Sequence, residues 1–503
     1  MSSIRVTYTG LISFIVSIST VTTGLIFVII VTRQLTLEEF GTFNLISGLV
    51  TYVYIFRPMI GYWATREIAR GIETGRTAFM STGMLATVAI FTYFLIAYFF
   101  GENTNVDQNI LLFAALLIPA EFFNQILKRI AQGFKPQLGE YGILIFEFTK
   151  IPVALALVYV LNLGLYGVIM TIFFANLASI VLLLFLTREK LKGEFKKIYI
   201  KKWLRLFWLP TYPQISQLIN VSDVAVVTLI TGSVNALAFW GAAKTVAHIV
   251  KHSSKIGSGV YPKLLSGGKK EIFQENLVLM MYFALPLAVM TIVFAKPTLF
   301  ILNPLYDVAV WVVIFLVPTI FLRSLSEFFR QSIAGREKVD TKSEATFKDY
   351  LKSKLFFLPT LTNIHRAGYL STLIIVLLFL HSQKIPEMEL VISWAIVLLV
   401  TQIPYTVYLY LLVKREFSLN IDIKSITKYG ISSVLAFGIQ FILIGEFLEY
   451  RESIFEFLPK FIPFMIMGIV TYIGITYLID LRTRKLLKGI IREITPKSKG
   501  RNN

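Results

Sequence analysis

Residues 40–71 read FGTFNLISGLVTYVYIFRPMIGYWATREIARG, and one arginine lies near the middle of this stretch. From Gly41 to Trp63 every residue except Arg57 is uncharged, and at about 1.5 Å per residue this run is long enough to cross a bilayer. The next basic residue, Arg66, lies roughly 13 Å further along the helix. The stretch therefore predicts a membrane-spanning helix that carries a cation inside it.

The charge of Arg57 is permanent, because the guanidinium pKa stays above about 12. Placing it at membrane depth costs at least ~2.5 kcal/mol unless it faces a wet cavity or a partner. Pro58 follows directly and lacks a backbone N–H, so it predicts a bend in the helix beside the charge. We interpret the cation next to a kink as a site that receives an anionic group. The alternative is that Arg57 pairs with a carboxylate on a neighbouring helix.

The rest of the chain has the composition of a membrane protein. Of its 503 residues 55% are apolar and only 16% are charged, and apolar runs of about 20 residues recur from end to end. The first run, Tyr8–Thr32, is too long for the core of a signal peptide, so we interpret it as a retained span. The absence of cysteine excludes disulfides and thiolate metal sites. The sequence predicts an all-α, polytopic membrane protein.

We count about 14 transmembrane helices. The candidate spans are Tyr8–Thr32, Gly41–Trp63, Phe79–Phe100, Ile110–Ile130, Tyr141–Leu161, Leu165–Leu186, Leu204–Ile230, Leu237–Ser258, Leu277–Leu302, Ala309–Phe329, Leu361–Leu380, Leu390–Val413, Tyr429–Ile444 and Phe461–Leu478. Lys and Arg gather in alternate connecting segments such as 188–205 and 330–354, whereas intervening segments such as 101–109 carry none. By the positive-inside rule, both termini are predicted to be cytoplasmic.

The chain also repeats itself at an offset of about 199 residues. Phe40–Gly41 opens the second span and Phe239–Gly241 opens the eighth. Pro119 in the fourth span and Pro318 in the tenth stand at the same offset. Two six-helix lobes related by an internal repeat are therefore predicted, with two further helices after the second lobe. The predicted parts are an N-terminal lobe at 1–187, a basic cytoplasmic linker at 188–205, a C-terminal lobe at 206–413, two additional helices at 414–480 and a basic cytoplasmic tail at 481–503.

Four further charges within the spans form two close pairs in the sequence. Glu147 and Lys150 are three residues apart on the fifth span. Arg323 and Glu327 are four residues apart on the tenth. Each pair can neutralise itself on one helix face, so we interpret both as structural.

The remaining charges within the spans have no such neighbour. Glu121 follows Pro119 closely and is predicted to line a cavity or to accept hydrogen bonds from the next helix. Asp223 and Lys244 lie on consecutive antiparallel spans and are predicted to pair; if they do not, Asp223 is a candidate proton or cation site. Breaks at Pro210 and Pro213, near the cytoplasmic end of the seventh span, suit a gate.

The sequence shows no motif of a soluble enzyme. His248 and His252 are four residues apart, but a third metal ligand is missing, and there is no Walker A loop. We therefore predict no metal, no cofactor and no enzyme activity. One outer segment, Gly445–Lys460, carries four glutamates and is the one place where an outer active site fits.

Two short segments resemble a known family. The hairpin Arg33–Gly41 (RQLTLEEFG) and the end of the second span, Gly61–Arg70 (GYWATREIAR), are similar to the corresponding segments of Wzx-type flippases of lipid-linked oligosaccharides. These flippases belong to the multidrug/oligosaccharidyl-lipid/polysaccharide exporter superfamily, which also holds the MATE drug exporters. The resemblance implies two lobes around a central cavity with cations that receive the diphosphate of a polyprenyl-linked glycan. On this basis the candidate substrate-binding residues are Arg57, Lys150, Lys244 and Arg323.

The predicted function is transport of a polyprenyl-diphosphate-linked oligosaccharide from the cytoplasmic to the outer leaflet of the plasma (cell) membrane, by alternating access, for surface polysaccharide or glycan biosynthesis. Asp223 and Glu121 are the candidate ion-coupling residues. Basic amphipathic stretches at 344–358 and 484–494 add anionic membrane lipids as partners, and other glycan-assembly membrane proteins are expected too, but not nucleic acid. The alternatives are a MATE-like ion-coupled exporter of small molecules and a membrane-embedded glycan polymerase or glycosyltransferase.

Overall fold

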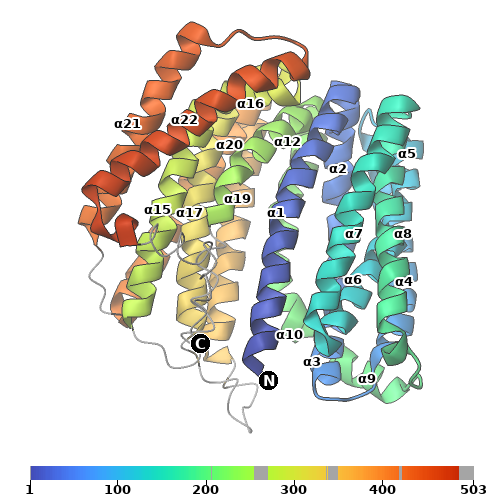
Figure 1. Ribbon diagram of the computed structural model, residues 1–503. Helices are drawn as coiled ribbons and strands as arrows, with labels where there is room; N and C mark the ends of the chain where they lie inside the picture. The colour runs from blue at the N-terminus through green and yellow to red at the C-terminus, as the bar shows by residue number, and fades with distance from the viewer. Residues whose placement is uncertain are drawn as a thin grey trace, which may run out of the picture. The chain divides into compact units, whose positions relative to one another are not determined.

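The computed structural model describes residues 2–205, 207–253, 270–335, 337, 349, 351–417 and 422–485, and their regular structure is helical throughout (Figure 1). The helices are α1 (Ser2–Gln34), α2 (Leu37–Tyr54), α3 (Arg57–Ala69), α4 (Gly75–Asn103), α5 (Gln108–Phe113), α6 (Leu117–Phe134), α7 (Pro136–Ala154), α8 (Gly164–Leu191), α9 (Lys197–Arg205), α10 (Trp208–Thr211), α11 (Ile215–Thr231), α12 (Asn235–Ala247), α15 (Lys270–Val293), α16 (Ala295–Leu302), α17 (Val310–Ala334), α19 (Lys354–Ser382), α20 (Glu387–Phe417), α21 (Ile423–Phe447) and α22 (Ile454–Ile479). Short 3-10 segments cover Ala114–Leu116, Tyr212–Gln214, His248–Ser253 and Pro304–Ala309, and a π-helical segment covers Leu155–Val160.

The helices coincide with the predicted spans. In the part of the chain that the structure describes, eleven helices are long and apolar enough to cross a membrane, or twelve if the bent pair α2 and α3 counts as one span. The two other predicted spans fall on α1 and α12. The chain is a multi-pass, all-helical membrane protein, and the predicted fold class is confirmed.

The chain divides into two compact units. Unit 1 consists of Met1–Ala242 with Pro359–Trp394, and unit 2 of Ala243–Leu358 with Ala395–Asn503. The six-helix lobes inferred from the repeat, with their linker and C-terminal additions, stay a prediction. Of the predicted interfacial stretch 344–358, residues 349 and 351–358 are described, and the last five of these belong to α19; most of the stretch 484–494 lies outside the described residues.

Buried polar side chains join two of the membrane helices in unit 1. There α7 packs between α1 and α8, and α6 packs against α8 (Figure 1). Asn124 of α6 donates through Nδ2 to Asn176 Oδ1 of α8 at 2.6 Å, and Ser179 Oγ donates to Asn124 Oδ1 at 2.9 Å. Such bonds hold helices together where no water competes for the polar groups.

Unit 2 contains a network of the same kind between α17 and α20. Gln402 Nε2 donates to Ser326 Oγ at 3.2 Å, and the hydroxyls of Ser326 and Thr406 are 2.9 Å apart. Helices α6 and α17 carry Pro119 and Pro318, the two prolines that are 199 residues apart in the sequence repeat. In both halves, therefore, the fourth predicted span is bonded to the sixth through buried polar groups.

Two glutamates tie the starts of helices together in unit 1. Glu39 completes the capping box of α2 by accepting from the Thr36 N–H at 2.9 Å, and its other oxygen accepts from the Leu165 N–H in the first turn of α8 at 3.2 Å. Glu387, at the start of α20, accepts from the Ala236 N–H in the first turn of α12 at 2.9 Å. The hairpin motif that includes Glu39 is thus explained by helix capping, which satisfies backbone N–H groups that a helix start leaves unpaired.

The repeated glycines are points of close approach between α2 and α12. A Cβ added at Gly41 would lie 2.1 Å from the carbonyl oxygen of Val234, and one at Gly241 would lie 2.4 Å from Asn44 Nδ2. Small residues of this kind let membrane helices cross closely. The similarity of the two sequence segments therefore reflects one shared packing requirement.

Gly41→Ala is expected to lower the free energy of unfolding by about 1–3 kcal/mol, because the added methyl group collides with a backbone carbonyl that cannot move aside. Thermal unfolding in detergent measures the loss. Gly368→Ala is the matched control, since nothing lies within 4 Å of a Cβ added at that helical position. Equal melting of the two variants would show that the α2–α12 contact tolerates extra volume.

Candidate functional site

The span that contains Arg57 is broken into two helices. Helix α2 ends at Tyr54, α3 begins at Arg57, and the two axes differ by 56°. Pro58 lies in the first turn of α3, where the missing N–H leaves no hydrogen bond unmade. The predicted bend beside the charge is confirmed. Broken helices at membrane depth occur where the backbone is covered by protein or lines a cavity.

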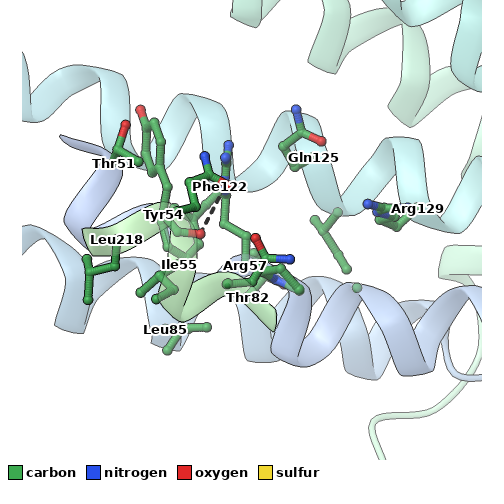
Figure 2. Close-up of a pocket in the computed structure, with 15 residues that line it drawn as sticks. Thr51, Tyr54, Ile55, Arg57, Thr82, Leu85, Phe122, Gln125, Arg129 and Leu218 are labelled. Carbon is green, nitrogen blue, oxygen red and sulfur yellow. Dashed lines mark hydrogen bonds between the residues drawn. The ribbon is translucent and has the colours of Figure 1, made fainter. Parts of the chain in front are cut away.

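Arg57 is held by a carboxylate on α6. Its Nη1 lies 2.5 Å from Glu121 Oε1, and Gln125 Nε2 donates to the same oxygen at 2.9 Å. The Arg57 Nε donates to the Tyr54 carbonyl at 3.3 Å, and the guanidinium lies 4.1 Å from the centre of the Tyr54 ring (Figure 2). The two charged side chains keep 26% and 22% of their surface exposed. The structure thus bears out the alternative in which Arg57 has a carboxylate partner, but leaves part of the cation accessible.

A cavity of about 200 Å³ opens beside Arg57 (Figure 2). It is lined by the last turn of α2, the first turns of α3, and parts of α4 and α6. The start of α11 and the residue before it form the remaining wall. Its polar lining consists of Thr51, Tyr54, Arg57, Thr82, Gln125, Arg129, Gln214 and Gln217. Among the described residues this lining has two arginines and no carboxylate, and Glu121 pairs with only one of the arginines. The cavity therefore offers hydrogen-bond donors and a surplus of positive charge.

Two of the lining residues could have been found from the spacing on α6. Gln125 and Arg129 follow Glu121 by four and eight residues, which places all three on one helix face. The sequence analysis named only Glu121 on this face, although the helical period also points to Gln125 and Arg129.

The glutamines on the other wall lie at and just after a 3-10 turn in the seventh predicted span. Helix α10 ends at Thr211, a 3-10 segment covers Tyr212–Gln214, and regular α-helix resumes at Ile215. The predicted break in the seventh span is confirmed. Gln214 in this 3-10 segment and Gln217 in α11 line the cavity, which the sequence analysis did not predict.

Lys150 is not one of the residues that line this cavity. Its Nζ lies 2.7 Å from Glu147 Oε2, and the same oxygen accepts from Thr23 Oγ1 of α1 at 2.5 Å. The Lys150 Nζ also lies 5.1 Å and 5.4 Å from the ring centres of Phe27 and Phe146. The self-neutralising pair predicted for Glu147 and Lys150 is confirmed, and its geometry supports a structural role.

The two other candidate cations, Lys244 and Arg323, lie in unit 2, whereas the cavity lies in unit 1. Glu327 is bound by Arg330 at 2.7 Å and by Gln331 at 3.0 Å. The pairing of Arg323 with Glu327, and the substrate-binding role of Lys244 and Arg323, stay predictions.

Asp223 is buried in a hydrogen-bond chain within unit 1. Its Oδ2 accepts from Tyr369 Oη at 2.9 Å, and that hydroxyl in turn accepts from Trp394 Nε1 at 2.7 Å. Trp394 stacks on Trp240 with ring centres 3.6 Å apart. The predicted pair of Asp223 with Lys244 spans the two units and stays a prediction. The aromatic partners could not be foreseen, because Tyr369 is 146 residues away in the sequence.

The side chains of the cavity indicate the chemistry of its ligand. No group of three or more His, Asp or Glu residues is placed to hold a metal in the part of the chain that the structure describes. Arginine binds planar anions through paired donors, and glutamine and threonine bind hydroxyl or amide groups. These side chains suit a polar ligand that carries an anionic group.

Several solved structures of transporters have a fold similar to that of this chain. An inward-facing multidrug resistance MATE family transporter of the MOP superfamily superposes with a TM-score of 0.58 and 14% sequence identity, over 79% of this chain and 95% of its own. The chain has the MATE fold. An outward-facing structure of a multidrug resistance MATE family transporter gives a TM-score of 0.51 at 14% identity, over 82% of this chain and 95% of its own. The MATE transporter VcmN of Vibrio cholerae gives 0.54 at 12% identity, over 82% of this chain and 97% of its own.

The MATE fold is compatible with the resemblance noted in the sequence, but a likeness at 12–14% identity shows the fold alone. No protein-family model matches the sequence, and no curated protein matches it either. The solved structures share too little sequence to assign a substrate, and the Wzx-type flippase family stays a prediction.

Proposed function

We propose that this chain is a membrane transporter that exports its substrate by alternating access. The observation that carries the proposal is the polar cavity beside the broken α2–α3 span, in a chain with the MATE fold. Related folds are known in inward-facing and outward-facing conformations. A discontinuous membrane helix that points backbone and charge at a cavity is a common way for transporters to build a substrate site.

The first candidate substrate is a small polar molecule with an anionic group. The fold favours small-molecule export, since the similar structures are named as multidrug resistance transporters. The cavity narrows the class of substrate to polar molecules that are not cations. Its arginines repel cations, and its glutamines and threonines suit polar groups. Export of this kind needs an energy source, and Asp223 and Glu121 are the proposed ion-coupling residues.

The second candidate is the flipping of a polyprenyl-diphosphate-linked oligosaccharide. Arg57 and Arg129 favour it, because a diphosphate presents oxygens that a guanidinium can bind in pairs. In this proposal the diphosphate lies against Arg57, the glycan contacts the glutamines, and the polyprenyl chain stays in lipid. The comparisons support this candidate less well than small-molecule export.

A glycan polymerase or glycosyltransferase is the weakest of the three. In the acidic outer segment, Glu449 is bound by Lys460 at 2.9 Å and by Arg451 at 3.1 Å. The hydrogen bonds from Lys460 and Arg451 lower the pKa of the Glu449 carboxyl. A carboxylate held in its charged form is poorly suited to donate a proton as a general acid.

Transport by the purified protein in liposomes separates these functions. Three probes are compared with protein-free liposomes: a fluorescent organic anion, a fluorescent polyprenyl-diphosphate sugar, and ethidium as an organic cation. Ion-driven movement of the anion is expected for the exporter, and movement of the lipid-linked sugar for the flippase. Movement of ethidium alone would contradict the charge-based assignment, and movement of no probe would argue against transport.

A further inference from the structure

A second cavity lies in unit 2, at the ends of three helices that the charge pattern places on the cytoplasmic side. It measures about 310 Å³ and lies between the early turns of α15, the start of α21 and the residues that follow α22. Its wall is apolar and aromatic and its rim carries two cations: Val278, Leu279, Tyr282 and Tyr429, with Arg482 and Lys485. An apolar wall beneath a cationic rim is the arrangement expected at a membrane interface.

A buried aspartate fixes the segment that carries the two cations. Asp480 directly follows α22, and its Oδ2 accepts from Tyr429 Oη and from the backbone N–H and hydroxyl of Thr483, each at 3.0 Å. Lys428 Nζ lies 4.0 Å from the other oxygen. The chain that follows α22 is therefore held in one conformation beside the cavity, and the cations are positioned before any ligand arrives.

Nearby acids balance the charge of the rim, but among the described residues both rim cations keep hydrogen-bond donors that these acids do not use. Arg482 pairs with Asp422 at 2.8 Å through Nη1, so its other N–H donors stay available for a ligand. Burial alone would raise the pKa of the Asp422 carboxyl, but hydrogen bonds from Ser425 and the charge of Arg482 hold it below its usual value. Among the described residues Lys485 makes no ion pair, and Glu275 is the only acid in the lining.

We propose that this cavity binds a phospholipid with an anionic head group, drawn from the cytoplasmic leaflet. The phosphate lies between Arg482 and Lys485, and an acyl chain follows the apolar wall along Val278 and Leu279 of α15. Arginine and lysine are the usual phosphate-binding residues, and the apolar wall excludes a free phosphate as the whole ligand. The site belongs to unit 2 and does not depend on which substrate is transported.

Native mass spectrometry of the full-length protein in a neutral detergent tests the proposal. Dioleoylphosphatidylglycerol, with an anionic head group, is titrated against dioleoylphosphatidylcholine, which has the same acyl chains. Preferential retention of phosphatidylglycerol is expected. On the scale of ~1 kcal/mol for each Lys or Arg near an anionic leaflet, Lys485→Gln should weaken binding about 5-fold and the double variant with Arg482→Gln about 30-fold.

The matched control is the double variant Lys414→Gln with Arg415→Gln, which removes two exposed cations from the same predicted side of the membrane, at the end of α20. It should leave the preference for phosphatidylglycerol unchanged. Lys485→Gln guards against misfolding, because it breaks no ion pair among the described residues. Equal binding of the two lipids, or equal losses in the test and control variants, would overturn the site. Tight competition by sn-glycerol 3-phosphate would show that the ligand is a soluble phosphate compound and not a lipid.

Discussion

Lys150→Met is expected to lower the free energy of unfolding by about 3–5 kcal/mol, although methionine is close to lysine in volume. The pair of Lys150 with Glu147 is buried, with side chains 9% and 8% exposed. Removing the cation leaves the Glu147 carboxylate at membrane depth with the Thr23 hydroxyl as a hydrogen-bond donor, which orients it but does not neutralise it. The variant must therefore bury an uncompensated charge or protonate Glu147, and both alternatives destabilise the fold.

The double variant Lys150→Met with Glu147→Leu separates a structural pair from a functional one. Replacing both charges removes the unpaired carboxylate, so this variant should melt closer to wild type than Lys150→Met does. Lys192→Met is the matched control, since Lys192 is exposed just after α8. Thermal unfolding in detergent measures all three. If Lys150→Met melts like Lys192→Met, the pair does not stabilise the fold.

The Glu147–Lys150 pair shows which part of this structure was accessible from the sequence. The two residues are three positions apart, so helix geometry alone brings them together. The bend at Pro58 is local in the same sense, because proline acts on the turn that contains it. The membrane spans follow from composition and length. Predictions of this kind need no knowledge of how the helices pack.

The contacts that build the cavity depend on packing instead. Arg57 and Glu121 are 64 residues apart, and the sequence offered several membrane carboxylates as possible partners for the arginine. Neither spacing nor charge distinguishes among them, since each lies on a different helix. Gln214 and Gln217 reach the cavity only because α11 packs against α2. The sequence thus predicted that Arg57 is special, but not which groups share its site.

Arg57→Ala is expected to weaken binding of an anionic substrate about 10- to 150-fold, the loss of one charge-assisted contact of roughly 1.5–3 kcal/mol. The partial exposure of the guanidinium toward the cavity is the reason, because a ligand can reach donors that Glu121 does not use. Arg57→Lys should lie between Ala and wild type, since lysine keeps the charge but loses the planar pair of donors. Binding of the fluorescent organic anion and of the lipid-linked sugar is measured on each variant, together with thermal stability.

Because Arg57 pairs with Glu121, substitution of the glutamate is also informative. Glu121→Gln removes the negative charge that competes with the ligand for Arg57, so binding of an anion should stay equal or tighten. Arg66→Ala is the control on the same helix, because Arg66 is exposed and bonds to Tyr62 outside the cavity lining. A purely structural pair gives a different pattern: Arg57→Ala and Glu121→Gln both lower the melting temperature, and neither changes binding. In that case the positive surplus of the cavity rests on Arg129 alone, and Arg57 is removed from the substrate site.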